Sequence, residues 1–461
     1  MSFSKLSEGK KLFGLLGMAL CAEMLCFGLC RANAPVKYFL YNDNSGTQLD
    51  YYKLLGYNYV GMFVGGTVLF SHASGMWVYN NGNYKTGRVA RDFRDLKRLA
   101  SQKGLNMVPI LWSLSYRDDW VSLDNQLPED QRSVSEFNGS YPAPSSLTFP
   151  CTRGWPREMD SQFNAHLNMI CAAGPAGFNK GVDEIFGENL KIIRDNWVKA
   201  DGTPDPVPPE FIHIGHDELG FSSACFVKIG RSKTRTESPA RLVAMEIDAR
   251  IKQIDAVLGQ SVQAIVYGDC MVPGSINGEM YGLCGNVDNG EGGILKFLDQ
   301  TYKVKNRLVV MPWGYSNVDG SVTRLCDGRS FVFSKVNQVR FLNALGYRYI
   351  AAAGEESPGS ESMLDMTRQT CFEWVKASQL FPERLIGFAD LVWPPFTSNA
   401  GTLQAGFTAP LLAYWCWTYG EKSLRLPRNN PYGPSMWKNV DYMKSRKEQA
   451  WKEGVHYWGP Q

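Results

Sequence analysis

Two adjacent carboxylates, Asp217 and Glu218, follow an apolar segment that has the composition of a buried strand. The segment 211–218 reads FIHIGHDE, so its first residues suit a protein core and its last two carry charge. Burying an acidic side chain is costly unless the carboxylate is paired or takes part in chemistry. A simpler interpretation is helix capping, in which either carboxylate favours the first turn of a following helix. Because the next residues are rich in Gly and Ser, which indicates a loop, we expect a functional site.

The elements that must position this pair follow from an alternation of short apolar runs with longer amphipathic ones beyond Pro35. Such alternation is typical of a parallel sheet with helices outside it. The clearest helical patterns lie at 182–198 and 240–258. The repeated strand–helix unit predicts an α/β fold of the (β/α)8 TIM-barrel type, occupying 35–461. The predicted strands are 37–42, 59–64, 107–113, 211–217, 262–269, 308–315, 349–353 and 385–393.

A weak internal repeat marks the points where helices turn into strands. LGYNYV at 55–60 recurs as LGYRYI at 345–350, and KGLNMV at 103–108 is a looser copy. We expect the Gly of each copy to end a helix in the left-handed conformation. The longest insertion, from about 116 to 180 after the third strand, is rich in Pro, Ser, Asn and aromatic residues, and we expect it to cover one side of the barrel mouth.

In such a barrel the residues at the carboxyl ends of the strands share one mouth. Here those residues are aromatic and acidic, although Trp and Tyr at such positions are also common as caps of a core. Flat apolar faces beside carboxylates suit a sugar, whose ring has a C–H face and a hydroxyl rim. Besides the acidic pair, the candidates for substrate binding are His216, Tyr267, Asp269, Trp313, Tyr315 and Trp393, and the mouth also includes Asn42, Asp43, Trp112, Glu355, Glu356 and Asp390.

The segment resembles glycoside hydrolase family 20, the β-N-acetylhexosaminidases, whose fourth barrel strand ends in a His-x-Gly-Gly-Asp-Glu motif. The matching residues are His213, Gly215, Asp217 and Glu218, and His216 stands where the family usually has its second Gly. Trp313 and Trp393 stand where the family uses tryptophans to wall the sugar pocket.

This resemblance implies a retaining, substrate-assisted hydrolysis of β-linked 2-acetamido sugars without a metal or other cofactor. Glu218 would be the general acid and then the base, and Asp217 would hold the acetamido group of the substrate. Neighbouring carboxylates push their pKa values apart, which suits two different roles. His213 would be structural. Groups that hold sugar hydroxyls in the family are replaced here by Asn42-Asp43, Gly354-Glu355-Glu356 and Pro395, so the sugar and the exo mode stay open.

Two other functions are compatible with the residues. A metal-dependent deacetylase would use His213, His216 and Asp217 as ligands, but residues three apart on a strand face opposite sides, so both imidazoles could not point inward without a bulge. A non-catalytic sugar-binding barrel would keep the aromatic residues of the pocket. Retention of both carboxylates argues against it, because a buried carboxylate without a task costs stability.

The first 34 residues read as a secretory signal peptide, with lysines before the apolar run 12–29 and a segment RANA at 31–34 that suits cleavage near Ala32 or Ala34. An uncleaved membrane anchor is the alternative, because the run is about long enough to span a bilayer. We therefore expect an exported protein without stable membrane insertion after cleavage, in which the eight cysteines between Cys151 and Cys416 could form disulfides. The 461 residues, 44% hydrophobic and 20% charged, suit a large globular core. A net charge of +3 gives no reason to expect nucleic acid, so the expected partner is a carbohydrate.

Overall fold

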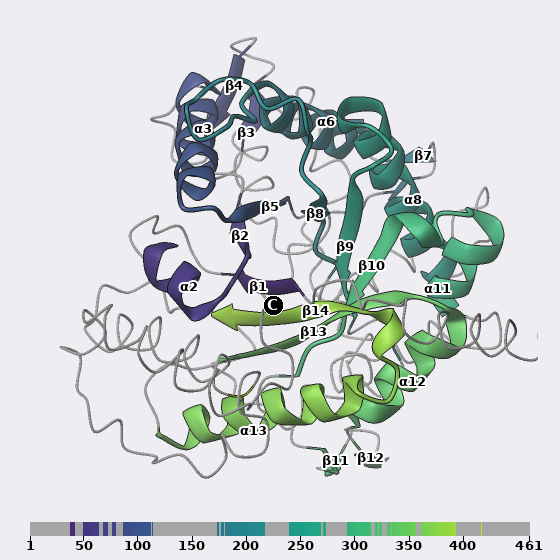
Figure 1. Ribbon diagram of the computed structural model, residues 1–461. Coiled ribbons are helices and arrows are strands. Elements are labelled where there is room, and N and C mark those ends of the chain that lie inside the picture. The colour runs from purple at the N-terminus through teal and green to yellow at the C-terminus, as the bar shows by residue number, and fades with distance from the viewer. Residues whose placement is uncertain are drawn as a thin grey trace, which may run out of the picture. The chain divides into compact units, whose positions relative to one another are not determined.

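The computed structural model contains a parallel α/β sheet with helices on its outer side (Figure 1). It describes residues 37–41, 49–63, 68–71, 76–79, 86–111, 113, 173–174, 177–178, 180–216, 239–268, 271–272, 293–314, 319–320, 322–324, 330–332, 334–355, 361–392 and 416. The parallel α/β class predicted from the sequence is confirmed. The predicted signal peptide and nearly all of the predicted insertion, 116–180, lie outside the described residues.

The strands of the main sheet pair in the order β1-β14-β13-β10-β9-β8-β5-β2, and β1 also pairs with β2, so that the order closes. Every pairing is parallel, and each strand begins within one residue of its predicted start. At the seam between the first and last strands, Lys37 lies opposite Gly387. The strands are β1 (Lys37–Tyr41), β2 (Tyr59–Phe63), β5 (Asn106–Ile110), β8 (Phe211–His213), β9 (Gln263–Tyr267), β10 (Leu308–Met311), β13 (Arg348–Glu355) and β14 (Leu385–Val392).

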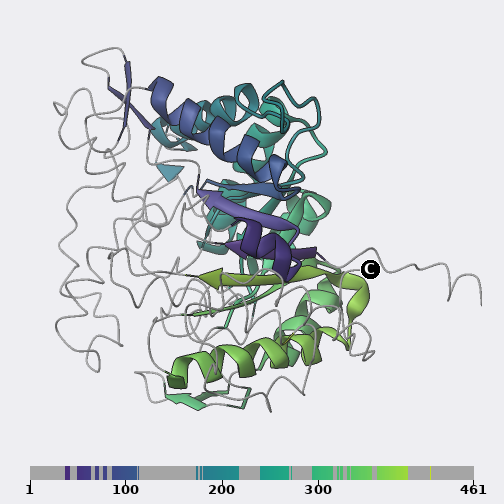
Figure 2. The ribbon, with the colours of Figure 1, turned by 60° about the vertical axis from the view of Figure 1, so that its left-hand side comes forward.

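Helices follow the strands along the chain and lie around the sheet, as Figures 1 and 2 show from two directions. Three short antiparallel pairs stand apart from the main sheet: β3 (Val68–Ser71) with β4 (Met76–Tyr79), β6 (Ala173–Gly174) with β7 (Gly177–Phe178), and β11 (Val322–Arg324) with β12 (Ser330–Val332). The α-helices are α2 (Leu49–Leu55), α3 (Thr86–Gln102), α6 (Lys180–Asp195), α8 (Pro239–Leu258), α11 (Gly293–Lys296), α12 (Lys335–Leu345) and α13 (Glu361–Ser378). Single turns of other helix types lie at Phe297–Thr301, Lys305–Arg307 and Pro382–Arg384.

The three glycines of the internal repeat end their helices as predicted. Gly56, Gly104 and Gly346 have φ angles of 94°, 66° and 74°, which lie in the left-handed region. After Gly346, the N–H of Tyr347 bonds back to the carbonyl of Leu342 at 2.9 Å, which satisfies a carbonyl that the helix end leaves open. Each helix therefore stops where the next strand must begin.

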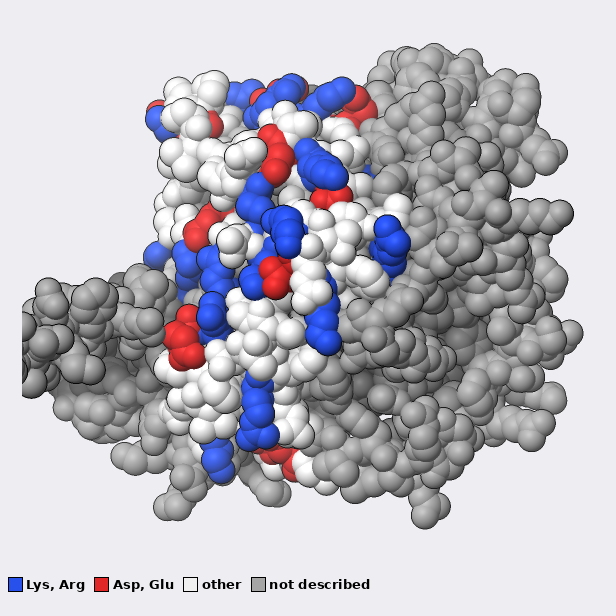
Figure 3. Space-filling view, turned by 90° about the vertical axis from the view of Figure 1, so that its right-hand side faces the viewer, with Lys and Arg blue, Asp and Glu red and all other residues white. Residues whose placement is uncertain are grey.

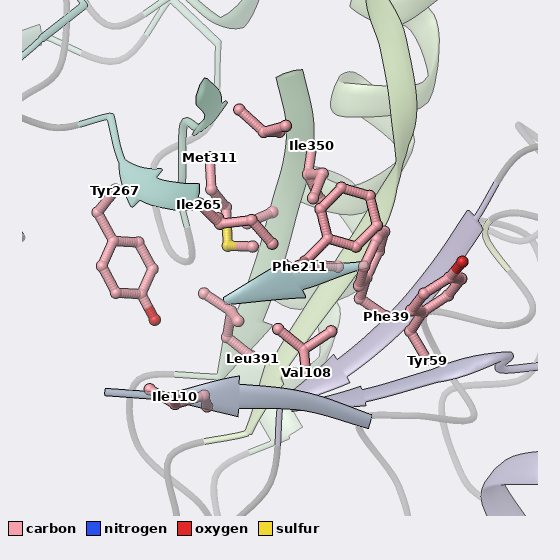
Figure 4. Close-up of a cluster of buried hydrophobic side chains, with 13 residues drawn as sticks. Phe39, Tyr59, Val108, Ile110, Phe211, Ile265, Tyr267, Met311, Ile350 and Leu391 are labelled. Carbon is pink, nitrogen blue, oxygen red and sulfur yellow. The ribbon is translucent and has the colours of Figure 1, made fainter. Parts of the chain in front are cut away.

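The inside of the main sheet is filled by a cluster of buried apolar side chains to which every strand contributes (Figure 4). The rings of Phe39, Tyr59 and Phe211 gather in one part of this cluster, and Tyr267 lies in another. Phe39 and Phe211 meet edge to face with ring centroids 5.7 Å apart. Members of the cluster are two residues apart where one strand supplies two of them, as the pleat of a strand requires.

An ion pair closes the end of the sheet at which the strands begin. Lys37, the first residue of β1, contacts both carboxylate oxygens of Glu210 at 2.8 and 2.9 Å and the hydroxyl of Tyr59 at 2.6 Å. The Tyr59 hydroxyl also donates to Glu210. Burial, together with the hydrogen bond and the negative charge of Glu210, raises the pKa of Tyr59 above its ordinary value. Residues at this end of a barrel contribute to stability more than to chemistry.

A buried lysine joins α12 to α13. Lys335 Nζ lies 2.8 Å from Glu373 Oε2 and 3.6 Å from Asp319 Oδ1, and the lysine side chain is fully buried. Burial lowers the pKa of Lys335, an effect that the two carboxylates partly oppose. Removing this cation would leave two neighbouring carboxylates without their shared partner.

The described part of the surface in Figure 3 carries basic and acidic side chains interspersed. Ion pairs elsewhere in the described structure include Arg307 with Asp255 and Lys305 with Asp299, at 2.5 and 2.9 Å. Among the described helices, none has the length and apolar character needed to cross a membrane.

Candidate active site

Strand β8, which precedes the predicted acidic pair in the chain, lies between β5 and β9. Phe211, Ile212, His213 and Ile214 are all buried; the three strand residues pair with β9, and His213 also pairs with Ile110 of β5. The ladder continues beyond the last strand residue, because Ile214 N–H donates to Ile265 and Gly215 C=O accepts from Tyr267, both at 2.9 Å. The chain is therefore held in the sheet up to Gly215.

The predicted strand 211–217 is longer than the observed one, which ends at His213. The reason lies in the backbone of the next residues, since Gly215 and His216 have φ angles of 80° and 72°. Glycine adopts this left-handed conformation freely, whereas a histidine there is strained. The chain thus turns out of the sheet immediately before the acidic pair.

His213 is fully buried and packs against Tyr267, with ring centroids 4.3 Å apart in an edge-to-face arrangement. Its Nδ1 accepts the N–H of Gly215 at 3.2 Å, so a neutral ring carries its proton on Nε2. Burial, with a smaller contribution from the charge of His216, lowers the pKa of His213 to about 3. These contacts fit the structural role expected of this residue.

His216 is also fully buried, and protein groups engage both of its ring nitrogens. Nδ1 lies 3.1 Å from the carbonyl oxygen of Ile214, and Nε2 contacts Glu246 Oε2 on α8. Glu246 in turn pairs with Arg250, whose Nε lies 2.9 Å from Oε1. The sequence places His216 among the substrate-binding residues, but its ring is bonded to the protein on both edges.

The electrostatics of this buried group favour an ionised Glu246. Burial alone would raise the pKa of its carboxyl group. The charge and hydrogen bond of His216, the charge of Arg250 and a hydrogen bond from Ser113 outweigh burial and lower that pKa. Glu246 is therefore a buried carboxylate held between His216 and Arg250.

Sequence reasoning did not identify Glu246 and Arg250, although a signal was present. Val243, Ile247 and Ile251 form the buried stripe of α8, and the two charged residues fall at helical spacing within the same face. Charged residues inside an apolar stripe need partners, because an unpaired buried charge is costly. Glu246 is partnered by Arg250 and by His216, which follows β8 in the chain.

The two histidines contact different parts of the structure. His213 packs on Tyr267 from the interior cluster, whereas His216 reaches Glu246 on the helix outside the sheet. In the described part of the chain, no group of three or more His, Cys, Asp or Glu side chains has the arrangement of a metal site.

Two of the other predicted site residues are described at the carboxyl ends of neighbouring strands. Tyr267 ends β9 and is 1% exposed, and Trp313 follows β10, is partly buried and packs against the interior cluster. A backbone bridge pairs Trp313 with Ala352 of β13. Asp390 of β14 is buried, 3.5 Å from the Tyr57 hydroxyl. Asp217, Glu218, Asp269, Tyr315 and Trp393 lie outside the described residues, as do Asn42, Asp43, Trp112 and Glu356.

Comparison with known proteins gives no match to any family model and no match to a curated protein sequence. Among solved structures, the chain is similar to the pneumococcal exo-β-D-N-acetylglucosaminidase StrH, with 9% identity, a TM-score of 0.46, and coverage of 90% of this chain and 98% of that one. It is also similar to the Vibrio harveyi family 20 exo-β-N-acetylglucosaminidase, with 12% identity, a TM-score of 0.46 and coverage of 89% and 58%.

A family 20 β-N-acetylhexosaminidase from Streptomyces coelicolor is similar as well, with 13% identity, a TM-score of 0.39 and coverage of 93% and 70%. An endo-β-1,4-mannanase from Cellulomonas fimi shares 12% identity at a TM-score of 0.40, with coverage of 82% and 70%. The solved structures to which this chain is similar are nearly all glycoside hydrolase family 20 β-N-acetylhexosaminidases.

Proposed function

We propose that this protein is a retaining glycoside hydrolase that cleaves β-linked N-acetylhexosamine residues by substrate-assisted catalysis. The observation that carries the proposal is the sequence HIGHDE at 213–218, which continues a buried strand of a closed parallel sheet. In such sheets the carboxyl ends of the strands share one side, and active sites lie there. Asp217 is one peptide bond beyond His216, the last described residue of this segment.

In this mechanism, Glu218 protonates the glycosidic oxygen as the bond to the leaving group breaks. Asp217 accepts a hydrogen bond from the acetamido N–H and orients the carbonyl oxygen of the substrate toward the anomeric carbon. The substrate itself is the nucleophile, so that a cyclic intermediate forms in place of a glycosyl-enzyme. Glu218 then acts as a base and activates the water that opens this intermediate, which restores the β configuration.

Three more of the predicted residues directly follow the last described residue after β9 or β10, or at the end of β14. Asp269 follows Gly268, Tyr315 follows Gly314, and Trp393 follows Val392. With Tyr267 and Trp313, they would supply aromatic walls and a hydroxyl-binding carboxylate around the sugar. The proposal includes a complete (β/α)8 catalytic barrel over 35–461, with the insertion 116–180 beside the mouth, and export directed by residues 1–34.

The experiment compares three chromogenic glycosides: the N-acetyl-β-glucosaminide, its galacto epimer and the β-glucoside that lacks the acetamido group. We expect turnover of at least one acetamido sugar and none of the β-glucoside. Glu218→Gln should lower kcat by roughly 10²–10⁴-fold, because general acid catalysis contributes about that much. Glu210→Gln is the matched control, since it makes the same exchange immediately before β8 and should keep the activity of the parent.

Other outcomes would overturn the proposal in distinguishable ways. Turnover of the β-glucoside alone would exclude substrate assistance. Binding of an acetamido sugar without turnover would identify a non-catalytic sugar-binding barrel. Release of acetate that a chelator abolishes and zinc restores would identify a deacetylase.

A further inference from the structure

We propose that Glu246 of α8, supported by Arg250, is a positioning residue for the acidic pair Asp217–Glu218, and that it acts through His216. The inference rests on the function proposed above. It adds a buried anchor on a helix to the residues proposed above for the reaction.

The backbone at residues 215–216 is in the left-handed conformation. Gly215 and His216 are consecutive residues with φ angles of 80° and 72°, and the described chain leaves the sheet through this turn. The resembled family has glycine at both positions, which suits a left-handed turn. A histidine has a Cβ that disfavours the same conformation, and such residues persist only where their surroundings fix them.

Contacts with the protein fix the side chain of His216. Its two ring nitrogens face two acceptors, the carbonyl oxygen of Ile214 and the carboxylate of Glu246. Both edges of the His216 ring are therefore bonded to the protein, and the contact with the Glu246 carboxylate is a buried one. The relative exposure of their side chains is 0% and 2%, so water does not screen the pair.

The carboxylate of Glu246 is itself held by Arg250. Arg250 lies one helical turn further along α8, with its Nε 2.9 Å from Glu246 Oε1 and its side chain fully buried. Its Nη1 donates to Gln253 Oε1 at 2.6 Å, and its guanidinium lies 5.1 Å from the ring centroid of Phe186 on α6. The anchor of His216 is thus built into the packing of α8 against α6.

The turn at His216 lies directly before the acidic pair in the chain. Asp217 and Glu218 follow the anchored residue by one and two peptide bonds, so a change of backbone conformation at His216 would be passed on to both of them. Catalytic groups displaced by about 1 Å can lose about 10²-fold in rate. Releasing the ring should therefore impair the chemical step more than it impairs binding of the sugar.

The test measures kcat and KM separately on the chromogenic acetamido sugar that the parent hydrolyses. Glu246→Gln should lower kcat at least tenfold and change KM less than about threefold. Asp248→Asn is the matched control, because Asp248 is a second buried carboxylate on α8 in an ion pair, with Lys252 at 2.6 Å. The control should keep the kcat of the parent.

A double variant separates positioning from general damage. Glycine needs no anchor in the left-handed region, so His216→Gly combined with Glu246→Gln should recover at least threefold in kcat over Glu246→Gln alone. If the role of Glu246 were purely structural, the fold-losses in kcat of the two single variants would multiply in the double variant. If Glu246→Gln does not fold, His216→Asn replaces it, since asparagine tolerates this conformation and is too short to reach Glu246.

The remaining outcomes decide the inference. An active parent whose kcat is unchanged by Glu246→Gln, or a double variant with multiplied losses, would overturn the positioning role and leave the proposed function intact. A parent without turnover would overturn the proposed function. Amide hydrogen exchange would then decide the anchor, which requires faster exchange at 214–216 in Glu246→Gln than in Asp248→Asn.

Discussion

Replacing His213 by Asn should make the protein less sensitive to mild acid. His213 is fully buried, and its pKa is lowered to about 3, whereas an unfolded chain has a histidine pKa of about 6.5. Between these values the unfolded state takes up a proton that the folded state does not. The stability associated with the neutral ring is therefore complete above about pH 6.5 and is lost as the pH falls toward about 3.

The size of the effect follows from the same two pKa values. A pH of 5.0 lies about 1.5 units below the pKa of this histidine in the unfolded chain, so protonation there stabilises the unfolded state. The free energy of unfolding of the parent is therefore about 2 kcal/mol lower at pH 5.0 than at pH 7.5. Asparagine keeps an acceptor for the N–H of Gly215, which now lies 3.2 Å from Nδ1 of the histidine, but it does not titrate. It also gives up the ring contact with Tyr267, so the variant should be about 1 kcal/mol less stable at pH 7.5.

Urea unfolding followed by tryptophan fluorescence measures both quantities, at pH 7.5 and at pH 5.0. The parent should be the more stable protein at pH 7.5, and the difference should fall by about 2 kcal/mol at pH 5.0. Other titrating groups are common to both proteins and cancel in the difference. Parallel loss of stability in the two proteins would refute the assignment of a neutral, buried His213.

Three further changes test the packing of the fold. Phe211→Ala removes a ring that is 1% exposed in the interior cluster and should cost about 3–5 kcal/mol in urea unfolding, whereas Val207→Ala, at a side chain that is 67% exposed, should cost less than about 0.5 kcal/mol. A Cβ at Gly387 would lie 2.0 Å from the carbonyl oxygen of Lys37, so Gly387→Ala should cost at least about 3 kcal/mol and lower the melting temperature, while Gly259→Ala, where a Cβ meets nothing within 4 Å, tests the φ effect alone. Lys335→Met leaves Glu373 and Asp319 without their shared cation and should cost about 3 kcal/mol, of which adding Glu373→Gln should recover part; equal stability of Lys335→Met and the parent would contradict the role given to this ion pair.

The sequence predicted the elements of the sheet better than the contacts of the site. Strand starts followed from apolar runs, because a strand buried on both faces needs an apolar sequence that a reader can recognise. The helix ends at Gly56, Gly104 and Gly346 followed from the one residue type that adopts the left-handed conformation without strain. Both kinds of information are local.

The surroundings of His216 could not be obtained in that way. Its partner Glu246 is 30 residues away in sequence, and the two meet only through the tertiary fold, which brings α8 to the residue that follows β8 by three positions. Spacing predicts what lies on one face of an element, but it does not predict which neighbouring element supplies a counter-ion. The roles of Asp217 and Glu218 remain predictions, since they follow from the resemblance of the motif.

The seam between β1 and β14 determines when the fold can be completed. Tyr57 and Asp390, which lie 3.5 Å apart near this seam, are separated by 333 positions in the chain. At a synthesis rate of about 5–20 residues per second, β1 waits on the order of tens of seconds for its second neighbour. Until then one edge of β1 has unpaired backbone groups that can pair with another chain. Pairing of β14 with β1 therefore closes the sheet and removes an edge at which the chain can aggregate. Loss of the segment 385–392 should lower the yield of folded protein before it changes the catalytic reaction.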